Sequence, residues 1–229
     1  MPCDSIVPFT TGRRWMLNIK LVMTLAPAYA PCTEFARTCA AMCWRPDMGH
    51  VPRGYLGATG SLEEVELVLV FAEPGDPHVG EKHAGMQSAY EYAMHAFQSG
   101  MDLFHRNVRS ILDLCWPGTP FEQQMRKVWM TESVLCSARS EGAPVPAAAA
   151  RACGERYLLP QLRLFSHALV VALGRKAQSR LSRVGFTSYV SAYAVAPPGC
   201  NRREARESWE RIPVALREHN ERIATSTVD

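Results

Sequence analysis

Residues 168–177 read ALVVALGRKA, and this stretch decides the fold class. Its first six residues form an unbroken apolar run, which is typical of a strand buried on both faces of a parallel sheet. Gly174 ends the run, and Arg175 and Lys176 begin a segment with helical character. A buried strand that leads directly into a helix is the repeating unit of α/β proteins.

Similar segments recur along the chain. Residues 66–71 and 128–135 are further candidate strands, and residues 185–195 contain a fourth strand-like segment. Between and after them, helical spacing is found in residues 86–114, 147–165 and 203–224. The alternation predicts an α/β fold: one three-layer αβα domain around a central, mainly parallel four-stranded sheet.

The chain has 229 residues, of which 47% are apolar, so it can bury one sizeable core. We expect the domain to occupy residues 31–229 and residues 1–30 to form an N-terminal extension. The pair Arg13-Arg14 and the later Ala28-Tyr29-Ala30 imitate a twin-arginine export signal, but Asn18 and Lys20 interrupt its apolar region. No segment is apolar enough to span a membrane. We therefore expect a cytoplasmic, nucleoid-associated monomer.

In a parallel sheet, the site lies where the strands end. Those ends carry residues 73–78, 131–136, 174–176 and 196–201. We therefore expect the functional residues in these four loops.

Four segments, in this order, resemble motifs of the iron-sulfur type (family 4) of the uracil-DNA glycosylase superfamily. A G-E-x-P-G motif is similar to residues 71–75, and P-F-V-G to residues 77–80. A T-N-V-V-K-C strand is similar to residues 131–136, and P-x-V-I-V-A-L-G-x-x-A is similar to the stretch that ends at Ala177. The resemblance covers about residues 36–200. It implies a DNA glycosylase of base-excision repair that flips a uracil or a related damaged base out of DNA and hydrolyses its glycosidic bond.

The family binds a 4Fe-4S cluster through four cysteines, for which thiolate ligands are usual. The resemblance assigns this role to Cys39, Cys43, Cys136 and Cys153. The first pair is spaced C-x3-C where the family has C-x2-C, so Cys32 is an alternative ligand. A zinc site or unligated core cysteines are the other interpretations.

The catalytic candidates differ from the family's residues. Glu73 and Asp76 are the carboxylates available to position water, and the family's own acid falls at Ala72. His78 stands where the family stacks an aromatic ring on the base, and it can stack or polarise. Glu132 replaces the base-reading asparagine; an ionised carboxylate only accepts hydrogen bonds, so Glu132 either selects bases that present donors or has a raised pKa.

The remaining candidates contact DNA. In the family's H-P-S motif the histidine column holds Ala196. Basic residues are concentrated between residues 175 and 206, as phosphate contacts require, although the net charge is only +3. The DNA-binding candidates are Gly75, Ser133, Gly174, Arg175, Lys176, Pro197, Asn201, Arg202 and Arg203.

Two other functions remain open. The missing histidine and asparagine are compatible with a non-catalytic protein that binds lesions or abasic sites on the same fold. A glycine turn after a valine-rich strand also occurs in unrelated α/β nucleotide-binding proteins.

Overall fold

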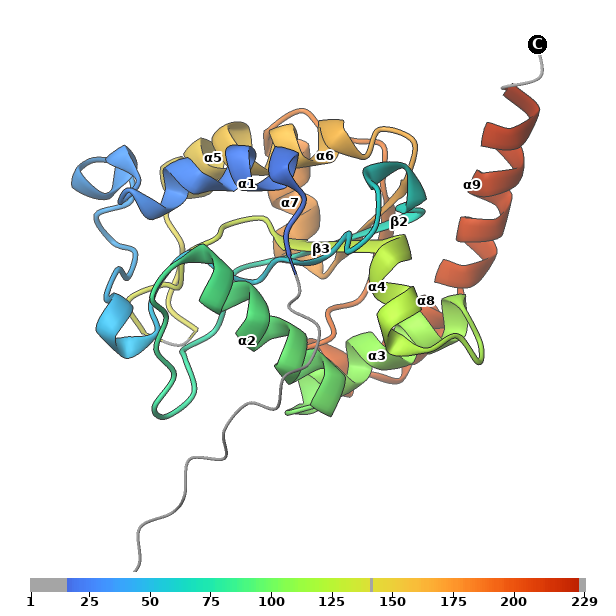
Figure 1. The fold of residues 1–229 in the computed structure, drawn as a ribbon, viewed down its shortest axis with the longest axis horizontal. Helices are drawn as coiled ribbons and strands as arrows, with labels where there is room; N and C mark the ends of the chain where they lie inside the picture. The colour runs from blue at the N-terminus through green and yellow to red at the C-terminus, as the bar shows by residue number, and fades with distance from the viewer. Residues whose placement is uncertain (1–15, 141, 227–229) are drawn as a thin grey trace, which may run out of the picture.

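The computed structural model describes residues 16–140 and 142–226. Its strands form a single mixed sheet in the order β1-β3-β2-β4-β5 (Figure 1). The strands are β1 (Leu56–Gly57), β2 (Leu67–Phe71), β3 (Val128–Glu132), β4 (Leu169–Leu173) and β5 (Val190–Ala192). Strands β3, β2, β4 and β5 run parallel, and β1 pairs antiparallel with β3.

The predicted α/β class is confirmed, whereas the prediction of four strands is wrong by one. Strand β1 adds a fifth, antiparallel strand at the edge of the sheet. It has only two residues, which is too short to show a periodicity in the sequence.

Helices cover both faces of the sheet (Figure 1). Helices α1, α5, α6 and α7 lie on one face, and α2 and α3 lie on the other. The bounds are α1 (Ile19–Leu25), α2 (Met86–Ser99), α3 (Leu103–Cys115), α4 (Phe121–Lys127), α5 (Ala147–Cys153), α6 (Leu159–Leu164), α7 (Arg175–Arg183), α8 (Arg203–Glu210) and α9 (Ile212–Ser226). A π-helical turn (Gly154–Leu158) joins α5 to α6, and single 3₁₀ turns occupy Ala26–Tyr29, Thr33–Ala36, Pro46–Met48, Leu62–Glu64 and Gly199–Asn201.

The segment 86–114, which shows helical spacing throughout, is divided into α2 and α3. Gly100 ends α2 in the left-handed conformation, with φ of 62°. Asp102 then caps α3 by accepting a hydrogen bond from the backbone N–H of His105 at 3.0 Å. The break turns the start of α3, and with it Asp102, toward the end of the sheet at which the cavity described below lies.

The three central strands end level with one another. Phe71 of β2 is in register with Glu132 of β3, and Val70 is in register with Ala172 of β4. Every residue of these three strands is buried. The loops that follow them therefore meet at one edge of the sheet.

The N-terminal segment packs into the same core as the domain. Leu21 and Leu25 of α1 are fully buried, and Leu17 and Ala28 belong to the same hydrophobic cluster. The described part of the expected extension is thus part of the domain, while Arg13 and Arg14 lie outside the described residues. No helix in the described ranges is both long and apolar enough to traverse a bilayer.

This packing predicts that Leu21→Ala destabilises the protein by about 2–5 kcal/mol, because it leaves a cavity in the core. Met23→Ala is the matched control on the same helix, since the Met23 side chain is 72% exposed; its effect should stay within about 0.5 kcal/mol. Urea unfolding followed by circular dichroism measures both. Equal effects of the two variants would show that α1 does not contribute to the core.

Candidate active site

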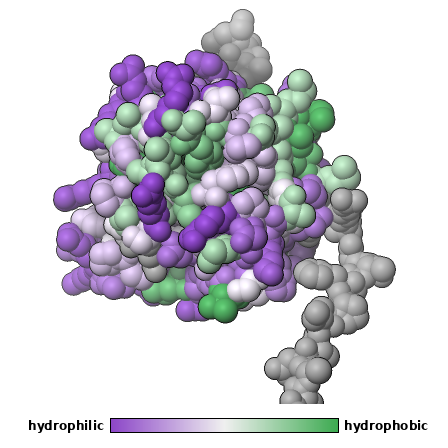
Figure 2. Space-filling view, turned by 90° about the vertical axis from the view of Figure 1, so that its left-hand side faces the viewer, coloured by the Kyte–Doolittle hydropathy of each residue, from purple (hydrophilic) through white to green (hydrophobic). Residues whose placement is uncertain are grey.

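A cavity of about 580 Å³ lies at the edge of the sheet where the parallel strands end. It is bounded by the loops that follow β2 and β5, by the ends of β3 and β4, by residues 53–56, and by α2 and the start of α3. Seen from this side, hydrophobic side chains form a patch bordered by hydrophilic ones (Figure 2). Of the residues expected from the sequence, those that line the cavity are Glu73, Gly75, Asp76, His78, Glu132 and Pro197.

Glu132 ends β3 and is 5% exposed. Burial raises the pKa of its carboxyl group well above the usual value, and the nearby Glu73 carboxylate raises it further, against the opposing charges of Arg180 and Arg53. Its Oε2 atom has no hydrogen-bond partner among the described residues. The raised pKa favours the neutral carboxylic acid, and the buried Oε2 atom is a polar group without a hydrogen-bond partner in the described ranges.

Gly54 explains how the carboxyl group of Glu132 is held. A Cβ atom on Gly54 would lie 2.3 Å from the Glu132 Cγ, and the backbone of Gly54 has a φ of +84°. Both the close approach and the left-handed conformation require glycine at this position. The backbone at Gly54 therefore forms a wall against which Glu132 packs.

Glu73 is held by two cations from α7. Its carboxylate lies 2.5 Å from Lys176 Nζ and 2.5 Å from Arg180 Nη1. Arg180 Nη1 also donates to the carbonyl oxygen of Ala72 at 2.7 Å and to Ser133 Oγ at 3.2 Å. Glu73 therefore anchors the loop after β2, and its two ion pairs leave it less available to orient water.

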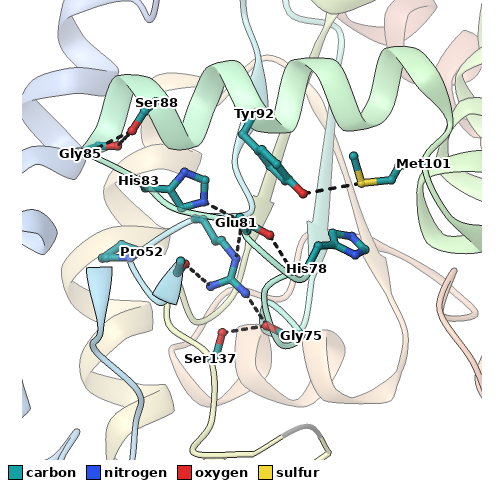
Figure 3. Close-up of polar contacts among 12 residues, drawn as sticks. Pro52, Gly75, His78, Glu81, His83, Gly85, Ser88, Tyr92, Met101 and Ser137 are labelled. Carbon is teal, nitrogen blue, oxygen red and sulfur yellow. Dashed lines mark hydrogen bonds and ion pairs between the residues drawn. The ribbon is translucent and has the colours of Figure 1, made fainter. Parts of the chain in front are cut away.

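A second polar network fixes the far part of the same loop (Figure 3). Arg53 donates to the carbonyl oxygen of Gly75 at 2.5 Å, and Ser137 donates to the same oxygen at 2.8 Å. Glu81 accepts from the backbone N–H of His78 at 2.9 Å and contacts His83 Nε2 at 2.6 Å. Arg53 and Glu81 line the cavity, and the sequence analysis assigned no role to either.

Packing does not require a glycine at position 75. A Cβ atom there would meet no atom within 4 Å, so the space beside it is open toward the cavity that it lines. An approach of a ligand to this backbone is sterically free.

Asp76 and His78 are the exposed acid and base of the loop. The Asp76 side chain is 44% exposed, and its Oδ1 lies 3.9 Å from His50 Nε2. The His78 side chain is 48% exposed, and its Nε2 lies 3.6 Å from Asp102 Oδ2. Both side chains remain accessible to a molecule in the cavity.

Apolar rings form the opposite wall of the cavity. Phe71 and Phe104 meet edge to face with ring centroids 5.1 Å apart, and Phe97 lies 5.7 Å from Phe104. Tyr92 on α2 also lines the cavity, and burial together with the Glu81 carboxylate raises its pKa to about 12. An aromatic wall opposite polar groups suits a flat, polar heterocycle.

The other expected DNA-binding residues lie outside the lining of this cavity. Arg175 is exposed at the start of α7, and Gly174 precedes it with a φ of +95°. Ser133 is buried and donates to the Ala72 carbonyl at 2.7 Å, which is a structural contact. Lys176 pairs with Glu73, and Asn201, Arg202 and Arg203 are exposed near the start of α8.

Ala196 lines the cavity where the family has its histidine. Asn107 of α3 holds the preceding residue by donating to the Val195 carbonyl at 2.8 Å. The contact from Asn107 thus holds this loop at the cavity, but the Ala196 side chain cannot donate a hydrogen bond.

Four cysteines line a second, small cavity of about 20 Å³ beneath the N-terminal segment. They are Cys32, Cys39, Cys136 and Cys153; Cys43 is buried but does not line it. Burial raises the pKa of the Cys39, Cys136 and Cys153 thiols, to about 12 for Cys153. The structure therefore brings three of the four expected ligands together and puts Cys32 in the place of the fourth.

Among the described residues, no three His, Cys, Asp or Glu side chains are arranged to hold one metal ion. In a four-iron cluster each cysteine binds a different iron, so its ligands need not converge on one point. The all-cysteine donor set fits a cluster, although the present cavity must widen to receive one.

A scan of the sequence against protein-family models finds no match. A search of curated proteins likewise finds no match.

The buried acid predicts a pH dependence of stability. Below the usual glutamate pKa, Glu132 is protonated in both the folded and the unfolded chain. As the pH rises, the unfolded chain releases this proton while the folded chain retains it. The free energy of unfolding of the wild type therefore decreases with pH, from the usual glutamate pKa up to the raised pKa of Glu132 in the folded chain. Glu132→Gln lacks this loss, and its stability relative to wild type should increase between about pH 4 and pH 8.

Urea unfolding of both proteins across this range measures the difference. Glu204→Gln, which removes an exposed carboxylate from α8, controls for the change of net charge. Parallel stability curves for wild type and Glu132→Gln would contradict a neutral buried acid.

Proposed function

We propose that the protein is a DNA glycosylase that hydrolyses the glycosidic bond of uracil or a related damaged base after base flipping. One observation carries the proposal: Glu132, a buried acid whose raised pKa favours the protonated form, lines a cavity bounded by segments that resemble glycosylase motifs. The cavity volume lies in the usual range for small-molecule sites. The three-layer αβα arrangement of the superfamily is compatible with helices on both faces of the sheet.

Glu132 reads the edge of the base. A protonated carboxylic acid presents one O–H donor beside one C=O acceptor, as an amide presents N–H beside C=O. Uracil and hypoxanthine each present a ring N–H next to a carbonyl oxygen, which such an acid matches. Glu132 therefore performs the asparagine's task, provided that its proton is retained.

The reaction requires a water molecule at C1′ of the flipped nucleotide. The water oxygen bonds to C1′, the bond from C1′ to the base nitrogen breaks, and its electron pair leaves with the base. Asp76 and His78 reach the cavity from the same loop and are the groups available to orient the water and accept its proton. The Glu132 O–H stabilises the charge that develops on the base oxygen, a role for which Ala196 has no donor.

The partner is DNA. Arg175, Arg202 and Arg203 are exposed cations on the two helices that follow β4 and β5, and we assign phosphate contacts to them. Lys176 is committed to Glu73 and contributes less.

Purified protein should convert oligonucleotides that carry uracil or hypoxanthine into alkali-labile abasic sites. Glu132→Gln should keep activity within about tenfold of wild type, since the amide preserves donor and acceptor, whereas Glu132→Ala should lose about 10²-fold or more in kcat/KM. Gel analysis of end-labelled strands after alkali gives the rates.

Binding of lesion DNA without any strand breakage would favour a second function, a non-catalytic lesion or abasic-site binder. The absence of a donor at Ala196 is the observation that favours it. Neither binding nor breakage would overturn both functions.

We further propose that Cys32, Cys39, Cys136 and Cys153 hold a 4Fe-4S cluster. The cluster would supply a structural cross-link. Burial raises the pKa of the Cys136 and Cys153 thiols, and the positive charge of the iron would stabilise their thiolate forms against this effect. Cys32 already lies near Tyr157, whose hydroxyl donates to its Sγ at 3.3 Å. This ties the segment before η2 (Thr33–Ala36) to the helical turn after Cys153.

Protein purified without oxygen should absorb broadly near about 400 nm and contain iron and sulfide. Cys32→Ala should lose the absorbance, and Cys43→Ala should keep it, because Cys43 does not line the cavity. Colourless, iron-free wild-type protein would remove the cluster from the proposal. Loss of colour in Cys43→Ala alone would instead restore Cys43 as the fourth ligand.

A further inference from the structure

Three titratable side chains form a cluster at the rim of the cavity. Asp102 lies between two histidines: its Oδ2 is 3.6 Å from His78 Nε2, and its Oδ1 is 2.8 Å from His105 Nδ1. All three residues line the cavity, and they come from two segments, the loop after β2 and the start of α3. The resemblance assigned no role to Asp102 or His105.

Asp102 is built to remain a carboxylate. Partial burial alone would raise its pKa, but the backbone N–H and the imidazole of His105 hold the pKa below its usual value. His105 is mostly buried against Phe97, with centroids 4.6 Å apart, and burial lowers its own pKa. His105 is therefore a neutral donor that fixes the rotamer of Asp102.

The geometry also selects the tautomer of His78. Its Nε2 is the ring nitrogen that faces Asp102, so a neutral ring carries its proton there. The lone pair then lies on Nδ1, the nitrogen left for another partner. A carboxylate that orients an imidazole in this way is a recurrent device for making histidine a general base.

We propose that His78 and Asp102 form the dyad that activates the hydrolytic water, with Asp102 and His105 as positioning residues. This inference rests on the proposed glycosylase function. The water oxygen bonds to C1′, its proton passes to His78 Nδ1, and the glycosidic electron pair leaves with the base. Asp102 stabilises the resulting imidazolium, which later releases the proton to solvent or to the departed base. Asp76 then orients the water and does not carry its proton.

The charged and titratable groups around His78 are few. Asp102 and His105 face it from α3, Tyr92 lies on α2, and Glu81 accepts from its backbone N–H. Glu81 is in turn occupied by His83 and Arg53. Asp102 is therefore the carboxylate that faces the His78 ring, with Oδ2 3.6 Å from Nε2.

Asp102→Asn is the decisive variant, because asparagine still caps α3 but carries no charge. Asp113→Asn is the matched control: it makes the same change on α3, at an exposed residue outside the cavity lining. Two measurements are needed. One is the ¹⁵N NMR spectrum of the neutral His78 ring, which shows the nitrogen that carries the proton, and the other is kcat/KM on uracil-containing DNA.

In wild type the proton of the neutral His78 ring should lie on Nε2, whereas in Asp102→Asn it should be shared between the two ring nitrogens, because the carboxylate that faces Nε2 is lost. The value of kcat/KM should drop about 10²-fold with it. Asp113→Asn should match wild type in both measurements, and an unchanged circular dichroism spectrum of Asp102→Asn excludes a folding defect.

Two failures are distinguishable. The same distribution of the His78 ring proton in wild type and Asp102→Asn overturns the dyad, even when the wild type is an active glycosylase. A wild type that cleaves none of the tested bases overturns the glycosylase function, and the catalytic role of the dyad fails with it.

Discussion

The site depends on the contacts that the guanidinium group of Arg180 makes. This group projects from α7, the helix after β4, and contacts the Ala72 carbonyl, Ser133 Oγ and the Glu73 carboxylate. One side chain thus ties together the ends of β2, β3 and β4. A single nitrogen, Nη1, makes all three contacts, so these strand ends are held relative to one another by a nearly buried charge, whose loss would leave Glu73 with Lys176 as its ion-pair partner.

The same clamp governs the chemistry of Glu132. By pairing with Glu73, Arg180 keeps a carboxylate close to the second acid, and that charge adds to burial in raising the pKa of Glu132. Arg180 and Arg53 act in the opposite direction but do not prevail. Paired carboxyl groups in other proteins are similar: unequal environments keep one acid charged and the other protonated. Glu73 thereby affects the reading of a base without touching it.

Composition was sufficient to predict the strands of the sheet's interior. β2 and β4 consist of apolar residues buried on both faces, so their type and order follow from the sequence alone. The loops at their ends, and with them Asp76, His78 and Glu132, were correctly expected at one edge. β1 could not be predicted because two residues show no pattern, and its pairing with β3 is decided by tertiary contacts.

The groups to which the sequence analysis assigned no role share one property: they act on residues far away along the chain. Arg53 reaches Gly75, and Asp102 reaches His78. Nothing in their local pattern marks them, although the break at Gly100 was a local signal for the cap at Asp102. The protonation of Glu132 was left open for the same reason, since burial depends on Gly54 packing across from it.

Under the proposed glycosylase function, the three departures from the family motifs that the sequence resembles belong to one rearrangement. A neutral Glu132 would replace the donor and acceptor of the family's asparagine, and its O–H would also serve the base oxygen that the family's histidine, aligned with Ala196, serves. His78 no longer has to be a stacking ring, because Phe71 and Phe104 already form an aromatic wall. Freed from stacking, an imidazole beside Asp102 can take the proton that Glu73, bound by Arg180 and Lys176, cannot. The substitutions thus compensate one another only if Glu132 is protonated, and that single proton links the fold of the strand ends to the chemistry of the cavity.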